Sequence, residues 1–336
     1  MMSTHHRFSL VLSMISILMA IALSLAACGA SASSGASSTP LKNVSIGLSY
    51  NPDIQFAPFY VALSKGYYKA AGLSVTLNHG TVNTTFAALA AGKSTFAFAG
   101  GDELLGELNK HKDLQAIDVA TIFQKYPVSL IVPADSPIKT LADLKGHTIG
   151  DPFKGGSTYT GLLALLYSAK IALSAVNVEA IGFNQVAALT QHRVDAVMGY
   201  SNNQPLQIES SGMKVRTFDV SDYLPLVSNG IISTQQTSRT QPGLVRGFVQ
   251  ATLKGLQDAI NDPNHAVQIS KQYVPGMNAS LALEVLKATI PIYRGDGHLG
   301  YNDGKIWLSM EQFLVSQKLG APVGNLAQIY TNQYIQ

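Results

Sequence analysis

The chain has 336 residues, of which 46% are hydrophobic, and this length suits two globular lobes rather than a single core. Its 23 basic and 20 acidic residues give a formal net charge of +3 and are scattered, so we expect no nucleic-acid partner and no polybasic membrane patch. The sole cysteine, Cys28, excludes an internal disulfide and a thiolate cluster for zinc or iron–sulfur.

Residues 1–28 have the pattern of a secretory signal and are not part of the fold. A weakly basic tip precedes an apolar run over residues 8–27, and small residues lead to Cys28, which resembles the cysteine of a bacterial lipobox. The run is short for a membrane span, and the cysteine lies where a cleavage site belongs. We therefore predict that Cys28 is lipidated and that the protein is extracytoplasmic and lipid-anchored to the cell membrane. A transmembrane anchor with an incidental cysteine is the alternative.

The next segment, residues 29–40, is rich in Ser, Ala and Gly and is expected to form a flexible linker. The folded part then opens with a strand–loop–helix–strand unit. Alternating apolar residues predict strands over residues 44–48 and 73–77. Apolar residues at helical spacing predict a helix between them that ends before Gly72.

Two loops of the first lobe follow predicted strands and are candidate ligand contacts, because ligands bind outside the carboxyl ends of strands in open α/β sheets. The first, residues 50–56, is polar and aromatic. The second follows the strand predicted over residues 95–99 and contains Gly100 and Gly101, with Asp102 as the expected N-cap of the next helix. Glycines let a ligand approach the backbone, although a tight turn before a capped helix explains them equally. Strands that alternate with helices indicate a parallel sheet.

A crossing segment into a second lobe is indicated by the prolines of residues 133–137. A long helix predicted over residues 158–171 begins after Gly155, Gly156 and Ser157, and free N–H groups at a helix start favour an anion or a ligand carbonyl. An ordinary capped helix is the alternative. The strand predicted over residues 194–198 opens into a loop with a tyrosine and two asparagines.

The last third of the chain is predicted to return to the first lobe. Residues 229–233 are expected to cross back, and the remainder is expected to be mostly helical. The helical segments include one over about residues 242–261, and a tail helix is expected from about Asn325.

Three phrases, in this order, carry a resemblance to a known family: QFAPFYVALSKGYYKAAGLSV, SPIKTLADLKGHTIG and RVDAVMGYSNN. With the lipobox, they resemble the solute-binding proteins of ABC importers, in the class II branch for thiamine-pyrimidine precursors, sulfonates, nitrate and riboflavin. The form QFAPFYVA resembles the members that take flat heterocycles.

The resemblance implies an α/β, two-lobed class II periplasmic-binding-protein fold. Each lobe would be a mostly parallel sheet flanked by helices, with two crossing segments as the hinge. It places the first lobe at residues 41–132 and 231–336 and the second at residues 133–230.

The function expected from this resemblance is capture of a small flat heterocycle, of the thiamine pyrimidine precursor or riboflavin type, between the lobes. A monomer would deliver this small-molecule ligand to an ABC permease and its ATPase, with no cofactor, no metal and no catalysis. Aromatic side chains would stack on the ring, and amides and carboxylates would bind its heteroatoms. The expected ligand-binding residues are Asn51, Asp53, Gln55, Phe56, Gly101, Asp102, Tyr126, Gly156, Ser157, Tyr159, Tyr200, Asn202 and Asn203.

Other functions compete with this hypothesis. A sulfonate, taurine or nitrate anion could be held by the helix starts with Lys125 or Lys154, although no arginine lies in these loops. An enzyme of thiamine pyrimidine synthesis is a remote alternative, because that branch uses a cysteine-rich iron motif and this chain has no cysteine beyond Cys28. A structural surface lipoprotein is the third class, and it would show no ligand-dependent closure.

Overall fold

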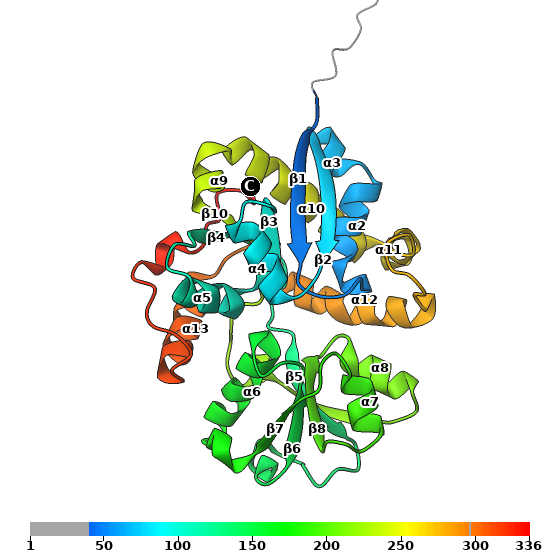
Figure 1. The fold of residues 1–336 in the computed structure, drawn as a ribbon. Coiled ribbons are helices and arrows are strands. Elements are labelled where there is room, and N and C mark those ends of the chain that lie inside the picture. Colours follow the sequence, from blue (N-terminus) through cyan, green and yellow to red (C-terminus); the bar gives the residue numbers. More distant parts are fainter. Residues whose placement is uncertain (1–39, 296) are drawn as a thin grey trace, which may run out of the picture. The chain divides into compact units, whose positions relative to one another are not determined.

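A computed structural model describes residues 40–295 and 297–336, which build two five-stranded sheets flanked by helices (Figure 1). The predicted signal, the lipidation at Cys28 and the linker as far as residue 39 lie outside the described residues. None of the helices in the described part is long and apolar enough to cross a membrane.

The two sheets have the same strand arrangement. In the first sheet the order is β2 (Leu73–His79), β1 (Lys42–Leu48), β3 (Phe96–Gly100), β10 (Asn229–Thr234) and β4 (Ala116–Thr121). In the second sheet the order is β7 (Asn177–Ala180), β6 (Thr148–Asp151), β8 (Ala196–Tyr200), β5 (Val128–Pro133) and β9 (Val215–Asp219). β2 and β7 lie at equivalent edges of the two sheets, and β10 and β5 occupy the fourth place. The chain arrives at each of these fourth strands from the other lobe.

That fourth strand runs against the others in both sheets. β10 is antiparallel to β3 and β4, and β5 is antiparallel to β8 and β9. β10 begins at Asn229, opposite the end of β3 at Gly100, and β5 begins at Val128, opposite the end of β8 at Tyr200. Because the chain enters each sheet at the edge where the other strands end, this one strand must run in the opposite direction. The expected α/β architecture with mostly parallel sheets is confirmed.

The crossing segments lie earlier than the sequence indicated. Residues 128–132 were expected in the first lobe, but Leu130 pairs with Met198 and Phe218 of the second sheet. The first crossing therefore precedes Val128, and Pro133 ends a strand instead. Residues 229–233 are themselves a strand of the first sheet rather than a crossing. Both strands are buried along all but their last residue, and burial alone does not reveal which sheet a strand joins.

Helices cover both sheets. Those of the first lobe are α2 (Ala57–Ser64), α3 (Tyr67–Ala70), α4 (Val82–Ala90), α5 (Gly101–Lys110), α9 (Gln235–Thr240), α10 (Pro242–Asn261), α11 (Pro263–Ser270), α12 (Ala279–Arg294) and α13 (Gly304–Ser316). Those of the second lobe are α6 (Gly156–Ser168), α7 (Gln185–Thr190) and α8 (Gln204–Ser210). The helix predicted between β1 and β2 is broken at Gly66, which adopts φ +72°, and Gly72 adopts φ +76° after it.

The tail helix predicted from Asn325 is wrong, because a 3-10 turn over Leu326–Gln328 is the only helical element there among the described residues. The tail instead bonds to the edge of the first sheet. The Asp118 N–H donates to the Ile329 carbonyl at 2.8 Å, and the Thr331 N–H donates to the Asp118 carbonyl at 2.9 Å. Pairing with β4 thus takes the backbone groups that a helix would have used.

The loop after β1 is fixed by packing beneath it. Phe56 and Phe59 both pack edge-on against Phe98, with ring centroids 5.9 and 5.2 Å away. The α2 helix crosses α10 so closely that a Cβ at Gly255 would lie 2.2 Å from the Pro58 carbonyl oxygen. This loop therefore presents its residues from a rigid base.

A buried polar network joins β4 to the end of the chain. Asn302 donates from Nδ2 to Asp118 Oδ1 at 3.0 Å, and its Oδ1 accepts from Thr121 and from Trp307, each at 2.8 Å. The other carboxylate oxygen, Asp118 Oδ2, has no hydrogen-bond partner among the described residues. Burial raises the pKa of Asp118 to about 7.

We expect the Asp118→Asn variant to change how stability depends on pH. Because the pKa of Asp118 is higher in the folded protein than in the unfolded chain, the folded protein keeps this proton at pH values where the unfolded chain has lost it. The protonated side chain therefore adds to the free energy of unfolding at low pH, and this stabilisation is lost as pH rises towards 7. The free energy of unfolding of the variant relative to wild type should therefore rise by about 1–3 kcal/mol between pH 5 and pH 8. Urea unfolding at both pH values measures it, with Asp135→Asn on the surface as the control. Equal pH slopes in wild type and Asp118→Asn would contradict the account.

Candidate ligand-binding site

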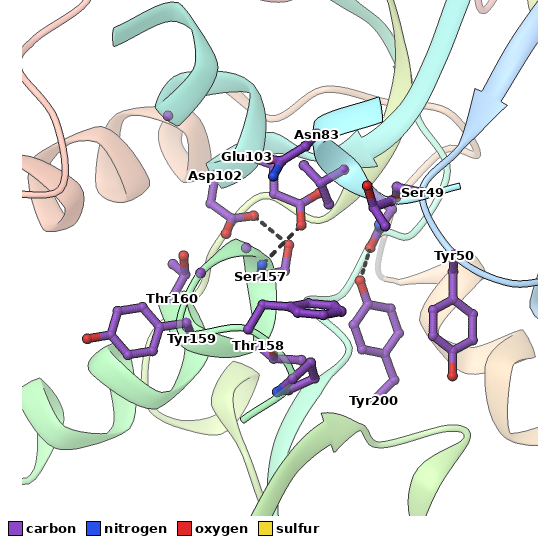
Figure 2. Close-up of a pocket in the computed structure, with 18 of the residues that line it drawn as sticks. Ser49, Tyr50, Asn83, Asp102, Glu103, Ser157, Thr158, Tyr159, Thr160 and Tyr200 are labelled. Carbon is purple, nitrogen blue, oxygen red and sulfur yellow. Dashed lines mark hydrogen bonds between the residues drawn. The ribbon is translucent and has the colours of Figure 1, made fainter. Parts of the chain in front are cut away.

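A cavity of about 590 Å³ opens at the edge where the strands of both sheets end (Figure 2). Its walls come from both lobes: the loop after β1, the first turns of α4 and α5, the loop after β6 with the start of α6, and the end of β8. This volume lies within the range of small-molecule sites in proteins, about 300–1,000 Å³.

The starts of helices α5 and α6 meet across this cavity through two carboxylates. The Ser157 hydroxyl donates to Asp102 Oδ1 at 2.8 Å, and the Ser157 N–H donates to Glu103 Oε1 at 3.1 Å (Figure 2). The other oxygen of Glu103 accepts from the Gly100 N–H at 2.8 Å. One side chain of the first lobe thus satisfies backbone donors at both helix starts, where free N–H groups and the helix dipole favour a negative charge.

Burial controls the titration of this pair. Burial raises the pKa of Asp102, and burial together with the neighbouring charge of Asp102 raises the pKa of Glu103 to about 7. Gly156 adopts φ +72°, and a Cβ there would lie 2.9 Å from Glu103 Oε1. Glycine at position 156 is therefore required both by the backbone and by the carboxylate beside it.

The expected N-cap role of Asp102 is wrong. The N-cap residue is Gly100, and the side chain of Glu103 satisfies its N–H, while Asp102 lies within the first turn and is buried. In the sequence, Asp102 precedes a predicted helix, and an Asp in that position most often serves as the N-cap. The helix begins at Gly101, two residues earlier than an N-cap at Asp102 requires, so both acids lie in its first turn and line the cavity.

Tyr126 supports the site from the crossing segment. Its hydroxyl donates to the Ser157 carbonyl at 2.7 Å and to Asp102 Oδ2 at 3.4 Å. It is buried and is not among the residues that line the cavity. The structure therefore places Tyr126 behind the start of α6, outside the lining of the cavity.

Aromatic side chains form the opposite wall and the mouth of the cavity. Tyr50 meets Phe183 edge-on at 4.7 Å, and Phe183 meets Phe153 edge-on at 4.8 Å. Tyr50 follows β1, whereas Phe153 and Phe183 follow β6 and β7, so the three rings bridge the two lobes. Phe153 is 54% exposed and Phe183 is 36% exposed, which is unusual for side chains of this size. The remaining aromatic lining residues are Phe56, Phe98, Phe123, Tyr159 and Tyr200.

Phe153 and Phe183 are lining residues that the sequence analysis missed. Both follow strands of the second sheet at their carboxyl ends, so the rule applied to the other loops would have found them. Tyr50 was recognised as part of the loop after β1 but was not singled out.

Further hydrogen bonds join the lobes beside the cavity. The Tyr200 hydroxyl donates to Asn229 Oδ1 at 3.1 Å. Asn203 donates to Asp53 Oδ2 at 3.2 Å, and Asn202 donates to Thr289 Oγ1 at 2.8 Å. Because these partners lie on different lobes, the two asparagines and Asp53 act between the lobes rather than in the cavity wall.

The thirteen expected binding residues therefore divide into two groups. Those that line the cavity are Gln55, Phe56, Asp102, Gly156, Ser157, Tyr159 and Tyr200. Those that lie elsewhere are Asn51, Asp53, Gly101, Tyr126, Asn202 and Asn203. Asn51 is exposed on its loop, and a Cβ at Gly101 would meet Val227 at 2.7 Å, so this glycine is explained by packing.

Charged groups of the wall are mostly acidic. Besides Asp102 and Glu103, the lining includes one more acid, Glu107, and two lysines, Lys110 and Lys154. Glu107 accepts from Lys110 Nζ at 2.9 Å. No arginine occurs among the described lining residues. Within residues 40–295 and 297–336, no three His, Cys, Asp or Glu side chains gather as a metal site would require.

Two known proteins are similar to this chain in sequence. The riboflavin-binding protein RibY of Chloroflexus aurantiacus is 34% identical over 306 residues, which cover 88% of this chain and 86% of the relative. The 4-amino-5-hydroxymethyl-2-methylpyrimidine phosphate synthase of Legionella pneumophila is 23% identical over 67% of this chain and 71% of its own length. Relatives thus include a binding protein and, at lower identity, an enzyme.

Solved structures identify the fold. The periplasmic aliphatic sulphonate binding protein SsuA of Escherichia coli superposes with a TM-score of 0.71 at 16% identity, covering 88% of this chain and 94% of that one. The fold is therefore that of the periplasmic binding proteins, as the resemblance implied. The family model described as NMT1/THI5 like matches residues 53–266, and the chain belongs to this NMT1/THI5-like family.

Proposed function

We propose that this protein is the substrate-binding lipoprotein of an ABC importer, and that it captures an uncharged flat heterocycle of the riboflavin type between its lobes. The observation that carries this proposal is the aromatic cavity formed jointly by the two lobes, with rings from the loops after β1, β6, β7 and β8. Aromatic rings contact a flat heterocycle face-to-face or edge-on, and each such pair contributes about 0.5–1.5 kcal/mol.

The relative named as a riboflavin-binding protein supports this ligand class. Riboflavin combines a fused ring with a hydroxyl-bearing chain, and the cavity combines an aromatic wall with acceptors at the helix starts. A thiamine pyrimidine precursor is a smaller ring that would contact fewer of these aromatics.

An anionic ligand such as a sulfonate, taurine or nitrate has less support. An anion binder of this kind needs free donors at its helix starts or a cation that forks onto the anion. Here Glu103 already accepts from both helix starts, and no arginine lines the described cavity. Lys154 remains as one lining cation without an acidic partner within 4.0 Å among the described residues.

We further propose that the protein carries out no catalysis. The Legionella relative is a synthase, but at 23% identity it is far more distant than the binding protein. The side chains of this site are explained by inter-lobe hydrogen bonds and ring contacts. Delivery to a permease and anchoring through Cys28 belong to the same proposal.

A thermal-shift screen tests the ligand class. Purified protein is melted with riboflavin, hydroxymethylpyrimidine, thiamine, taurine, ethanesulfonate and nitrate. A ligand at about 100 times its Kd stabilises the folded state by about 2.7 kcal/mol, which raises Tm by a few degrees. We expect the largest rise with riboflavin. A rise with ethanesulfonate or nitrate alone would contradict the proposed ligand.

The mouth aromatics give a second test. In Phe183→Ala the ring contact is lost while the fold is kept, because Phe183 is a partly exposed loop residue. Riboflavin fluorescence titration should show Kd raised roughly 2- to 10-fold, which corresponds to one aromatic pair. Tyr223→Ala removes an exposed aromatic of the second lobe outside the cavity and is the matched control. If Phe183→Ala and Tyr223→Ala bind riboflavin equally well, the mouth aromatics play no part in binding.

The predicted anchor is tested by Cys28→Ser in the producing cell. Loss of the thiol removes the acceptor for lipid, so the protein should move from the membrane fraction to the soluble fraction after cell breakage. Fractionation with metabolic lipid labelling measures both effects. Continued labelling of the variant would show that Cys28 is not the lipidated residue.

A further inference from the structure

Asp102 and Glu103 have a role beyond joining the lobes, and it concerns the charge of the ligand. The starts of α5 and α6 face the cavity, together with that of α4, and helix starts attract anions. The carboxylate of Glu103 accepts from Gly100 at the first start and from Ser157 at the second. The protein thus supplies its own anion at the position where an anionic ligand would bind.

The neighbours of this carboxylate reinforce its effect. Asp102 is 4% exposed and accepts from Ser157 and Tyr126, and Glu107 lines the same wall one turn along α5. The nearest basic group on that helix, Lys110, is bonded to Glu107 at 2.9 Å. Above about pH 7, where Glu103 is mostly ionised, an incoming phosphate or sulfonate would meet the buried Asp102 and the partly buried Glu103, and like charges there repel strongly because little water screens them.

The same carboxylates can still accept hydrogen bonds from a neutral ligand. Each ionised carboxylate offers about four acceptor positions. Glu103 uses one on each oxygen for backbone N–H groups, and Asp102 uses one on each oxygen for hydroxyls. The remaining positions suit hydroxyl or amide donors on a ligand.

We propose that Asp102 and Glu103 form a charge filter, which makes the cleft select uncharged, hydroxyl-bearing ring compounds and reject their phosphate esters and sulfonated analogues. This inference rests on the proposed function, the binding of a flat heterocycle. It adds that anionic derivatives of that heterocycle are rejected. It is specificity by a built-in repulsion rather than by an added attraction.

Riboflavin and its 5′-phosphate form the test pair, because they share the ring and differ by the phosphate. Fluorescence titration of the purified protein should show riboflavin bound at least about 30-fold more tightly than the phosphate. In the Asp102→Asn/Glu103→Gln double variant this ratio should shrink at least about tenfold, chiefly through tighter binding of the phosphate. Glu209→Gln removes an exposed acid outside the cavity and should leave the ratio as in wild type.

A second measurement does not depend on flavin. Ethanesulfonate should leave the melting temperature of wild type unchanged and should raise that of the double variant. If the double variant does not fold, Glu103→Gln and Asp102→Asn are measured singly, with smaller shifts in the same direction expected.

The outcomes separate this inference from the proposed function. Equal wild-type affinity for riboflavin and its phosphate would overturn the filter and leave the riboflavin proposal standing. Failure to bind riboflavin, with ethanesulfonate binding gained in the variants, would overturn the ligand proposal and support the filter. Variants that gain affinity for neither anion would overturn the filter, and wild type stabilised by ethanesulfonate but not by riboflavin would overturn both.

Discussion

Ser157 holds the start of α6 against the start of α5 through its hydroxyl and its N–H, and both bonds end on carboxylates of the other lobe. Helix starts carry backbone donors that must find acceptors, and a buried start without acceptors would be costly. Asp102 and Glu103 meet that need at both helices at once. This arrangement holds the two helix starts against each other and makes this wall of the cavity acidic.

The topology brings the chain connections to the same place. The strand that enters each sheet, β5 or β10, begins at the edge where its neighbours end, so both crossing segments pass beside the cavity. Tyr126 of the first crossing donates to the Ser157 carbonyl, and Asn229 at the end of the second accepts from Tyr200. A change in the angle between the lobes would alter these bonds directly. We therefore expect ligand binding to be linked to the angle between the lobes through contacts at the site itself.

Local sequence patterns were sufficient to predict most of the helices and strands. The α10 helix spans the predicted residues, 242–261, because its apolar stripe and first-turn proline are local signals. The positive φ of Gly72 also followed from a local rule. Seven of the expected site residues line the cavity because strand ends in an α/β sheet meet at one edge.

Tertiary partners decided the rest, and they leave little trace in a single sequence. Residues 128–132 are apolar apart from Ser129, so only their pairing with β8 shows to which lobe they belong. Tyr126, Asn202 and Asn203 looked like ligand contacts, but their partners are protein groups on the other lobe or at the start of α6. Glu103 was not among the expected site residues, because its partner Ser157 lies 54 positions away in the sequence.

The central claim is that a neutral flat ring lies among the aromatics while its hydroxyls reach the acidic helix starts. A crystal structure of the protein with riboflavin tests this most directly. We expect the ring between the lobes in contact with the Tyr50 and Phe183 wall, with hydroxyls of the chain bonded to Asp102 or Glu103. Riboflavin bound outside the cavity, or with its chain turned away from both carboxylates, would contradict the account.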